Sequence, residues 1–221
     1  MVFQNRKAAG QFLAKQLAGY ANRQDVLVLA LPRGGVPVAF EVAKALNAPL
    51  DVFVVRKLGV PEQQELAMGA IASGGVRVLN EDIVRSLGVS EAAINQVAAK
   101  EQQELERRER LYRGDRPVPT LHGRTVILVD DGLATGATMR AAVVASQQQK
   151  PAKIIVAVPV SASETCQEFQ SKVDEVVCAA TPSPFYSVGL WYEEFPQTTD
   201  EEVRVLLELA ANSQKTTAIG A

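Results

Sequence analysis

The chain has few of the residues that metal sites and covalent catalysis most often use. Among 221 residues there are one histidine, His122, and two cysteines, Cys166 and Cys178, which stand twelve positions apart without a CxxC pattern. We therefore expect reduced thiols, as is usual in a cytoplasmic protein. His122 lies in the segment RGDRPVPTLHGR, where we expect it to be solvent-exposed and not catalytic.

Long apolar runs and an excess of one charge are also missing. No apolar run approaches the ~18 residues of a membrane span, and the N-terminal MVFQNRKAAG lacks the apolar centre of a signal peptide. The 23 basic residues are dispersed among 25 acidic ones and only 5% of residues are aromatic, which does not suit an obligatory nucleic-acid binder. The composition predicts a cytoplasmic protein without a membrane partner or an obligatory nucleic-acid partner.

The chain does contain alternating strand-like and helix-like segments. With 47% hydrophobic residues it is long enough for one full α/β core and too short for two large domains. We predict a single domain over residues 1–212 and a disordered tail, SQKTTAIGA, at 213–221. An amphipathic helix at about 6–18 precedes five strands, most of them separated by helical patterns: 26–31, 51–55, 125–129, 153–158 and 175–179.

Such alternation predicts an α/β fold, a twisted, mainly parallel five-stranded sheet flanked by helices, with ligands at the carboxyl ends of the strands. Residues 80–113 form a helical insertion, with Glu104/Arg108 and Glu106/Arg110 at i,i+4 spacing. Its apolar stripe is thin, so we expect it not to be deeply buried: Ile94, Val97, Ala98, Leu105 and Tyr112. The insertion could cover the ligand site or form half of a dimer contact, and we expect a homodimer.

The most informative segment is VILVDDGLATGAT, residues 126–138. Four β-formers lead into two adjacent carboxylates, Asp130 and Asp131, and then into a turn of small residues that opens a helix. Small residues let backbone N–H groups approach a phosphate, and the N-terminus of a helix favours its negative charge. The turn residues that we expect to bind the phosphate are Ala134, Thr135, Gly136, Ala137 and Thr138.

The two acids would repel that phosphate, so the ligand must present hydroxyl groups or a metal ion to them, as a ribose 5-phosphate does. The segment resembles the phosphoribosyl-diphosphate (PRPP) signature of the type I phosphoribosyltransferases. That resemblance implies that Asp130 and Asp131 bind the ribose 2′- and 3′-hydroxyls and that the turn binds the 5′-phosphate. An ordinary strand-to-helix turn with a solvated Asp pair is the alternative, while the competing phosphate motifs GxxxxGKS/T and GxGxxG are absent.

A second glycine-rich turn lies upstream, where the strand-like run 26–31 is followed by Pro32, Arg33, Gly34 and Gly35 and then by a helical pattern. A Gly-Gly turn alone is a weak indicator, because many strand-to-helix turns need glycine for conformational reasons. Placed before the Asp-Asp segment, it resembles the pyrophosphate loop of the family. Family members often have a non-proline cis peptide in this loop, and Pro32–Arg33 is the candidate bond.

A basic pair, Arg56 and Lys57, follows the strand-like run DVFVV. Such pairs are usually solvated, but in orotate and adenine phosphoribosyltransferases an Arg-Lys pair occupies the corresponding strand end. The resemblance implies that Lys57 reaches the diphosphate. The next segment, PEQQELAMGAIASGGVRVLN, stands where the family has a mobile catalytic loop and a small antiparallel hairpin, and its acids are Glu62 and Glu65.

Aromatic residues concentrate after the last predicted strand, in TPSPFYSVGLWYEEF. They form either a hydrophobic cap on the sheet edge or a wall on which a flat heterocycle stacks, and we assign Phe185, Tyr186 and Trp191 to an acceptor site. The segment faintly resembles hypoxanthine-guanine phosphoribosyltransferases, but Trp191 stands where they have an Asp, and Ala134 replaces the acid in their phosphate turn. The turn is closer to that of adenine phosphoribosyltransferase. A guanine or hypoxanthine substrate is therefore disfavoured, and the acceptor stays open.

The resemblance implies transfer of the 5-phosphoribosyl group of PRPP to a nitrogen acceptor such as a heterocyclic base, with release of pyrophosphate. Mg²⁺ is the implied cofactor, held by Asp130 and Asp131 indirectly, through ribose or water. The implied catalytic residues are Lys57, Arg33, Glu65 and Asp131, with Glu65 as the candidate general base. The main alternative is a regulator that senses PRPP on the same fold, although no DNA-binding module is recognisable. Hydrolysis or phosphorolysis at the same ribosyl carbon is another.

Overall fold

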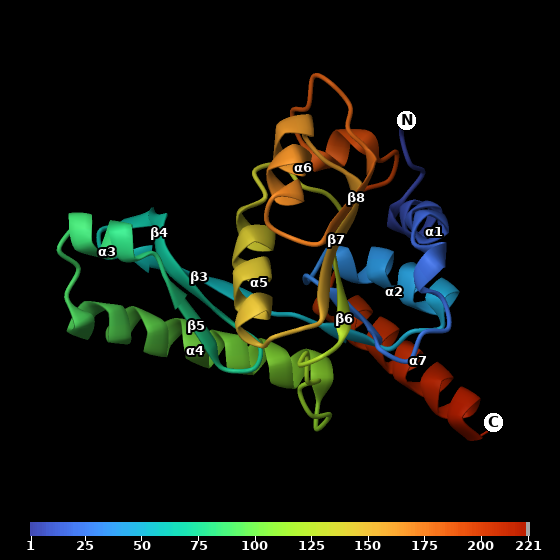
Figure 1. The fold of residues 1–221 in the computed structure, drawn as a ribbon, viewed down its shortest axis with the longest axis horizontal. Helices are drawn as coiled ribbons and strands as arrows, with labels where there is room; N and C mark the ends of the chain where they lie inside the picture. The colour runs from blue at the N-terminus through green and yellow to red at the C-terminus, as the bar shows by residue number, and fades with distance from the viewer. Residues whose placement is uncertain (220–221) are drawn as a thin grey trace.

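The computed structural model describes residues 1–219 and contains a five-stranded sheet, helices on both of its faces and a projecting arm (Figure 1). All neighbouring strands of the large sheet are parallel. Their spatial order is β2 (Leu50–Val52), β1 (Val26–Ala30), β6 (Thr125–Val129), β7 (Lys153–Val160) and β8 (Glu175–Ala180). From β1 the chain moves to β2 on one side and later returns as β6 on the other. The topological switch point, where ligands of such sheets bind, therefore lies between β1 and β6.

The sheet is buried on both faces because its central strands are almost entirely apolar. Along β1, Val26, Val28 and Ala30 belong to one buried cluster, and Leu27 and Leu29 to the other. On the first face lie α1 (Arg6–Gln16), α2 (Gly35–Leu46) and α7 (Asp200–Ile219); on the second lie α5 (Ala137–Gln148) and α6 (Ser163–Gln170) (Figure 1). The predicted α/β fold with a five-stranded parallel sheet is confirmed.

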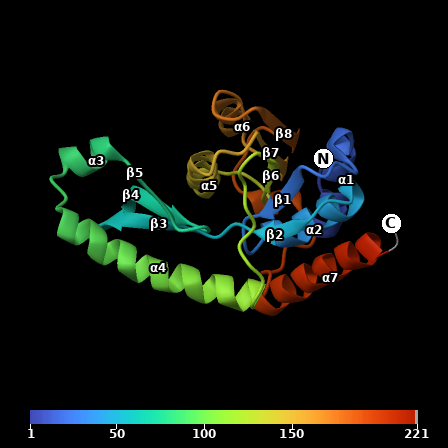
Figure 2. The ribbon, with the colours of Figure 1, turned by 60° about the horizontal axis from the view of Figure 1, so that its bottom comes forward.

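The arm is a three-stranded antiparallel sheet that projects away from the large sheet (Figure 2). It consists of β3 (Val55–Val60), β4 (Gln63–Ala72) and β5 (Val76–Leu79). The single strand predicted at 51–55 is thus two elements, because β2 ends at Val52 and β3 begins at Val55. After the arm, α3 (Glu81–Ser86) is followed by α4 (Glu91–Arg113), which runs back along the arm to the large sheet (Figure 2).

The expectation that the helical insertion is not deeply buried holds for most of α4, which is buried only along one narrow stripe. Four residues of its apolar stripe are buried, namely Ile94, Ala98, Leu105 and Tyr112, while Val97 is half-buried. The stripe is narrow, but it packs on the arm and on α7, and ion pairs accommodate the charges beside it. Of the two predicted pairs on the helix, Arg108 Nε lies 2.7 Å from Glu104, whereas Glu106 accepts a hydrogen bond from Gln102.

A buried ion pair joins the end of α4 to β2. Arg113 Nε lies 3.2 and 3.1 Å from the two carboxylate oxygens of Asp51, and an Nη donates to the carbonyl oxygen of Val52 at 3.0 Å. Both side chains are almost fully buried, and burial raises the pKa of Asp51 although Arg113 opposes the shift. No pattern in the sequence indicates this pair, because its members are far apart along the chain.

The tail predicted to be disordered from residue 213 is instead helical as far as Ile219, and residues 220–221 lie outside the described part of the chain. Three acids in the first turn of α7 favour the helix, and Val203 and Leu207 anchor it in the core. The segment SQKTTAI contains no proline or glycine that would end the helix. Among residues 1–219, none of the helices combines the length and the apolar character that crossing a membrane requires.

Candidate functional site

The phosphate turn, residues 132–138, follows β6 and lines a cavity of about 180 Å³. Gly136 has a φ of 69°, a left-handed conformation that favours glycine, and α5 begins at the next residue. In the described part of the chain no hydrogen bond uses the backbone N–H of Thr135, Gly136 or Ala137. The cavity is lined by Asp130, Gly132, Leu133, Ala134, Thr135, Gly136, Ala137, Thr138, Met139 and Val188, so all five predicted turn residues meet there.

Two side chains hold the carbonyl groups of this turn. The hydroxyl of Thr165 donates to the carbonyl oxygen of Ala134 at 2.8 Å, and an Nη of Arg140 donates to that of Thr135 at 2.7 Å. Because these acceptors are occupied, the turn presents donors to the cavity at the positive end of α5. This arrangement suits an anion.

The glycine loop, residues 32–35, packs directly on the acid pair. The Pro32–Arg33 peptide bond is cis, which confirms that prediction. A Cβ atom added to Gly34 would lie 2.1 Å from Oδ2 of Asp131, and one added to Gly35 would lie 2.7 Å from the carbonyl oxygen of Val129. Both positions therefore need glycine because the loop after β1 touches the loop after β6.

The two carboxylates share a desolvated environment. Burial raises the pKa of Asp130 well above its ordinary value, and the negative charge of Asp131 adds to the effect. Burial also raises the pKa of Asp131, although the guanidinium of Arg6 opposes the shift. The carboxylate of Asp130 accepts a hydrogen bond from the backbone N–H of Asp131 at 2.8 Å. Such an environment favours a ligand whose hydroxyl groups donate to both acids.

Arg6 is a site residue that the sequence did not indicate. Its Nε donates to Oδ2 of Asp131 at 2.8 Å, and an Nη donates to the carbonyl oxygen of Pro196 at 2.7 Å. Its guanidinium also lies 3.8 Å from the centroid of the Phe195 ring. The first turn of α1 thus positions one of the two acids. No local motif marks Arg6, since its partners come from two distant segments.

The structure places Lys57 and Glu65 on the arm and not with the other predicted residues. Lys57 is on β3, and its Nζ contacts the carbonyl oxygen of Glu65 at 3.3 Å and the Glu65 carboxylate at 3.4 Å. The Glu65 side chain is otherwise fully exposed. No contact or cavity of the described residues joins this pair to Arg33 or Asp131. The expected catalytic loop is only the turn between β3 and β4, which includes Glu62.

The aromatic segment divides into a packed part and an exposed part. Phe185 and Trp191 stack with their ring centroids 6.3 Å apart and join a small cluster between α1 and the sheet edge. The indole N–H of Trp191 is buried and has no partner among residues 1–219. Tyr186 is 79% exposed. Tyr192 has no role in the predicted site. Its hydroxyl donates a hydrogen bond to the carbonyl oxygen of Asp131 at 2.6 Å, so the aromatic segment contacts the loop that carries the two acids.

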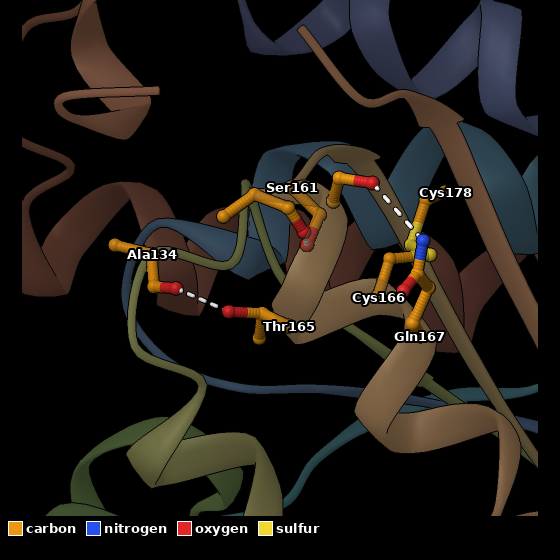
Figure 3. Close-up of a disulfide and its surroundings, with 8 residues drawn as sticks. Ala134, Ser161, Thr165, Cys166, Gln167 and Cys178 are labelled. Atoms are coloured by element: carbon orange, nitrogen blue, oxygen red, sulfur yellow. Dashed lines mark hydrogen bonds between the residues drawn. A yellow bond between two sulfur atoms is a disulfide. The ribbon is translucent and has the colours of Figure 1, made fainter. Parts of the chain in front are cut away.

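The expectation of two reduced thiols is wrong for this structure. Cys166 of α6 and Cys178 of β8 form a disulfide, because α6 packs on β8 with the two Cα atoms 6.5 Å apart (Figure 3). The neighbouring Thr165 is one of the two residues whose side chains hold the phosphate turn (Figure 3). His122, as expected, is exposed.

Known proteins resemble this chain over most of its length. A model of the phosphoribosyl transferase domain matches residues 2–187. Two Mycobacterium tuberculosis proteins, MT0597 of strain CDC 1551 and Rv0571c of strain H37Rv, are named as candidate phosphoribosyl transferases and are 51% identical over 210 residues. The alignment covers 95% of this chain and 47% of each relative, so the chain spans about half the length of the curated relatives it matches.

Solved structures agree with this likeness. The crystal structure of TT1426 from Thermus thermophilus is 41% identical, has a TM-score of 0.84, and the match covers 94% of this chain and 98% of that one. The structure of AQ2163 from Aquifex aeolicus, at 14% identity and a TM-score of 0.50, matches over 91% of this chain and 85% of that one. This second likeness concerns the fold alone.

Proposed function

This chain belongs to the phosphoribosyl transferase domain family, and on that premise we propose that it transfers the 5-phosphoribosyl group of PRPP to a nitrogen acceptor and releases pyrophosphate. One observation carries the proposal: the glycine loop after β1 packs on the acid pair after β6, at the switch point of the sheet. A ligand with a phosphate at one end, hydroxyl groups in the middle and a diphosphate at the other matches the groups that these loops present.

Each part of PRPP has a partner in this proposal. The free N–H groups of the phosphate turn bind the 5′-phosphate, and Asp130 and Asp131 accept hydrogen bonds from the two ribose hydroxyls. Hydrogen bonds of this kind, in which one partner is charged, contribute about 1.5–3 kcal/mol each. Arg33 and the backbone of Gly34 and Gly35 bind the diphosphate. A regulator that senses PRPP would share these contacts, so binding and turnover must be measured separately.

The reaction breaks the bond between ribose C1 and a diphosphate oxygen and forms a bond between C1 and the acceptor nitrogen. Positive charge develops on the ribose ring, where the two carboxylates stabilise it, and negative charge develops on the departing diphosphate. For Lys57 to contact the diphosphate, the arm must move toward the sheet edge. The same movement would bring Glu65 to the acceptor as a general base.

Magnesium fits this site as an ion that arrives with the substrate. Among residues 1–219, no group of three or more His, Cys, Asp or Glu side chains is placed to hold a metal. Mg²⁺ commonly uses one or two carboxylates together with substrate oxygens and water. Asp130 and Asp131 would hold it through ribose oxygens or water. When bound, it would neutralise charge on the diphosphate.

The acceptor contacts the aromatic segment in this proposal. The buried N–H of Trp191 lacks a partner within residues 1–219, and an indole offers only a donor at this edge. Because this N–H is buried, an acceptor would reach it only after the aromatic segment moves, and a planar acceptor that presents a lone pair would then be favoured over one that presents an amino group. Phe185 supports Trp191 by stacking, and the exposed Tyr186 is free to cover the acceptor from the solvent side.

The test is pyrophosphate release from PRPP and Mg²⁺ with a panel of heterocyclic bases and amines. We expect release that depends on one class of acceptor and that disappears when Asp130 and Asp131 are both changed to Asn. Ribose 5-phosphate formed without any acceptor would instead indicate hydrolysis. PRPP binding without release for any acceptor would contradict a transferase and favour a PRPP sensor.

A further inference from the structure

The end of α4 meets the beginning of α7 (Figure 2). A second cavity lies there, on the glycine loop. Its volume is about 350 Å³. The loop contributes the cis-bonded Pro32 and Arg33, and the other lining residues come from α4 and α7: Arg107, Arg108, Tyr112 and Asp200. Three guanidinium groups from two elements therefore line one cavity beside the predicted diphosphate loop.

Two acids partly balance these arginines. Glu104 accepts hydrogen bonds from Arg107 at 2.7 and 3.0 Å and from Arg108 at 2.7 Å. Asp200 accepts one from the hydroxyl of Tyr112 at 2.6 Å. With three positive and two negative side chains, the cavity and its border keep an excess of positive charge.

Several donors of the three arginines stay open. The guanidinium of Arg33 lies 3.7 Å from the carboxylate of Asp200 and makes no hydrogen bond within residues 1–219. Arg108 uses Nε for Glu104, and its two Nη atoms have no hydrogen-bond partner in the same range. Both side chains are about one-third exposed, so solvent reaches them. Guanidinium groups with free Nη atoms are suited to bind phosphate oxygens in pairs.

We propose that this cavity binds the outer phosphate of a diphosphate, which makes Arg107 and Arg108 of α4 part of the substrate site. The proposal rests on the proposed function, because the glycine loop is taken to hold the inner phosphate. Gly34 of this loop touches Asp131, while Arg33 lines the cavity, so the loop separates the ribose acids from the arginines. An anion entering the cavity replaces Asp200 as the partner of Arg33. The sequence left two roles open for the helical insertion, a cover over the ligand site or half of a dimer contact. Arginines of α4 that bind the diphosphate would make the insertion a cover beside the ligand site.

The test is calorimetric titration of the full chain with inorganic diphosphate and, separately, with ribose 5-phosphate. We expect the double variant R107Q/R108Q to bind diphosphate roughly 10- to 100-fold more weakly, while its affinity for ribose 5-phosphate changes less than about twofold. Arg110→Gln removes one positive charge from the same helix outside the cavity and should leave both affinities unchanged. Equal diphosphate affinity in R107Q/R108Q and the wild type would overturn the proposal.

A second variant guards against misfolding of the first. Glu104→Gln keeps all three arginines and frees two of them, so we expect diphosphate to bind a few-fold more tightly; weaker or unchanged binding would count against the site. Arginine-dependent diphosphate binding without any PRPP binding would contradict the proposed function and leave this site standing. Under saturating PRPP we expect no further diphosphate to bind. A second binding event that R107Q/R108Q abolishes would show a separate effector site and refute the assignment to the substrate.

Discussion

The two loops at the switch point and the arm hold their predicted substrate-binding residues in different ways. At the switch point, Gly34 and Asp131 are so close that no side-chain atom fits between them, and buried strands fix both loops. On the arm, Lys57 and Glu65 are exposed and contact mainly each other. Under the proposed function, the loops that bind ribose and phosphate would therefore be in place before the ligand arrives, whereas Lys57 and Glu65 would reach it only after the arm moves. Buried strands can hold ligand-binding loops in place before the ligand binds, but only for residues that directly follow those strands.

The buried ion pair between Arg113 of α4 and Asp51 of β2 connects the two regions, and breaking it should cause the largest loss of stability. Arg113→Ala leaves Asp51 as a buried, unpaired charge, and we expect a loss of about 3–5 kcal/mol in the free energy of unfolding, measured by urea denaturation. The matched variant Arg110→Ala removes an exposed arginine of the same helix and should change stability by less than about 0.5 kcal/mol. Equal losses of stability in the two variants would mean that the buried ion pair does not stabilise the contact between α4 and β2.

A side chain at Gly34 should weaken ligand binding at the two switch-point loops without unfolding the protein. In Gly34→Ala the new Cβ meets a carboxylate oxygen at 2.1 Å, so Asp131 or the loop must shift. We expect PRPP to bind about 100-fold more weakly by calorimetry, which corresponds to about 2.7 kcal/mol. Gly19→Ala is the control, because nothing lies within 4 Å of its Cβ position. PRPP affinity that survives Gly34→Ala would show that the packed contact is not part of the site.

Removing the arm's lysine should have a smaller and more selective effect. Lys57→Ala should weaken PRPP binding about 10-fold, because one positive charge that contacts the diphosphate is lost. Ribose 5-phosphate, which has no diphosphate, should bind within about twofold of the wild type. Lys44→Ala, an exposed lysine of α2, controls for net charge. If both ligands weaken equally in Lys57→Ala, the arm acts on the general potential or on folding and not on the diphosphate.

The smallest expected effect concerns stability and its dependence on pH. The pKa of Asp130 is raised in the folded chain, so ionising it costs folding free energy: stability is highest below the pKa of the unfolded chain and declines as pH rises through the folded pKa. Asp130→Asn removes the part of this decline that Asp130 causes. We expect the variant to be more stable than the wild type at pH 7, by less than about 2 kcal/mol. That difference should shrink as denaturation is repeated at lower pH, and a difference independent of pH would contradict the shift.

The sheet and the strand-to-helix turn at 132–138 were predictable because their signals are local. Apolar runs such as 125–129 form strands wherever both faces are covered. A turn of small residues after such a run is typical of the beginning of a helix. The glycine loop gained its meaning from its order relative to that turn. These features need no knowledge of distant contacts.

The remaining features depend on segments that only the fold brings together. Arg6 reaches Asp131 across the sheet edge, and Arg113 reaches Asp51 through the return of α4. The surface on which the narrow stripe of α4 packs was not predicted, because it belongs to the arm and to α7. The disulfide was missed because spacing along the chain does not show that α6 packs on β8.

The measurement that tests the central claim most directly is calorimetry of PRPP, with Mg²⁺, on the wild type and on the double variant D130N/D131N. We predict binding by the wild type and at least about 100-fold weaker binding by the variant, because two charge-assisted acceptors for the ribose hydroxyls are lost. The urea midpoint of the variant confirms that it is folded. Undiminished PRPP affinity in the folded variant would contradict the assignment of the switch-point loops as the PRPP site.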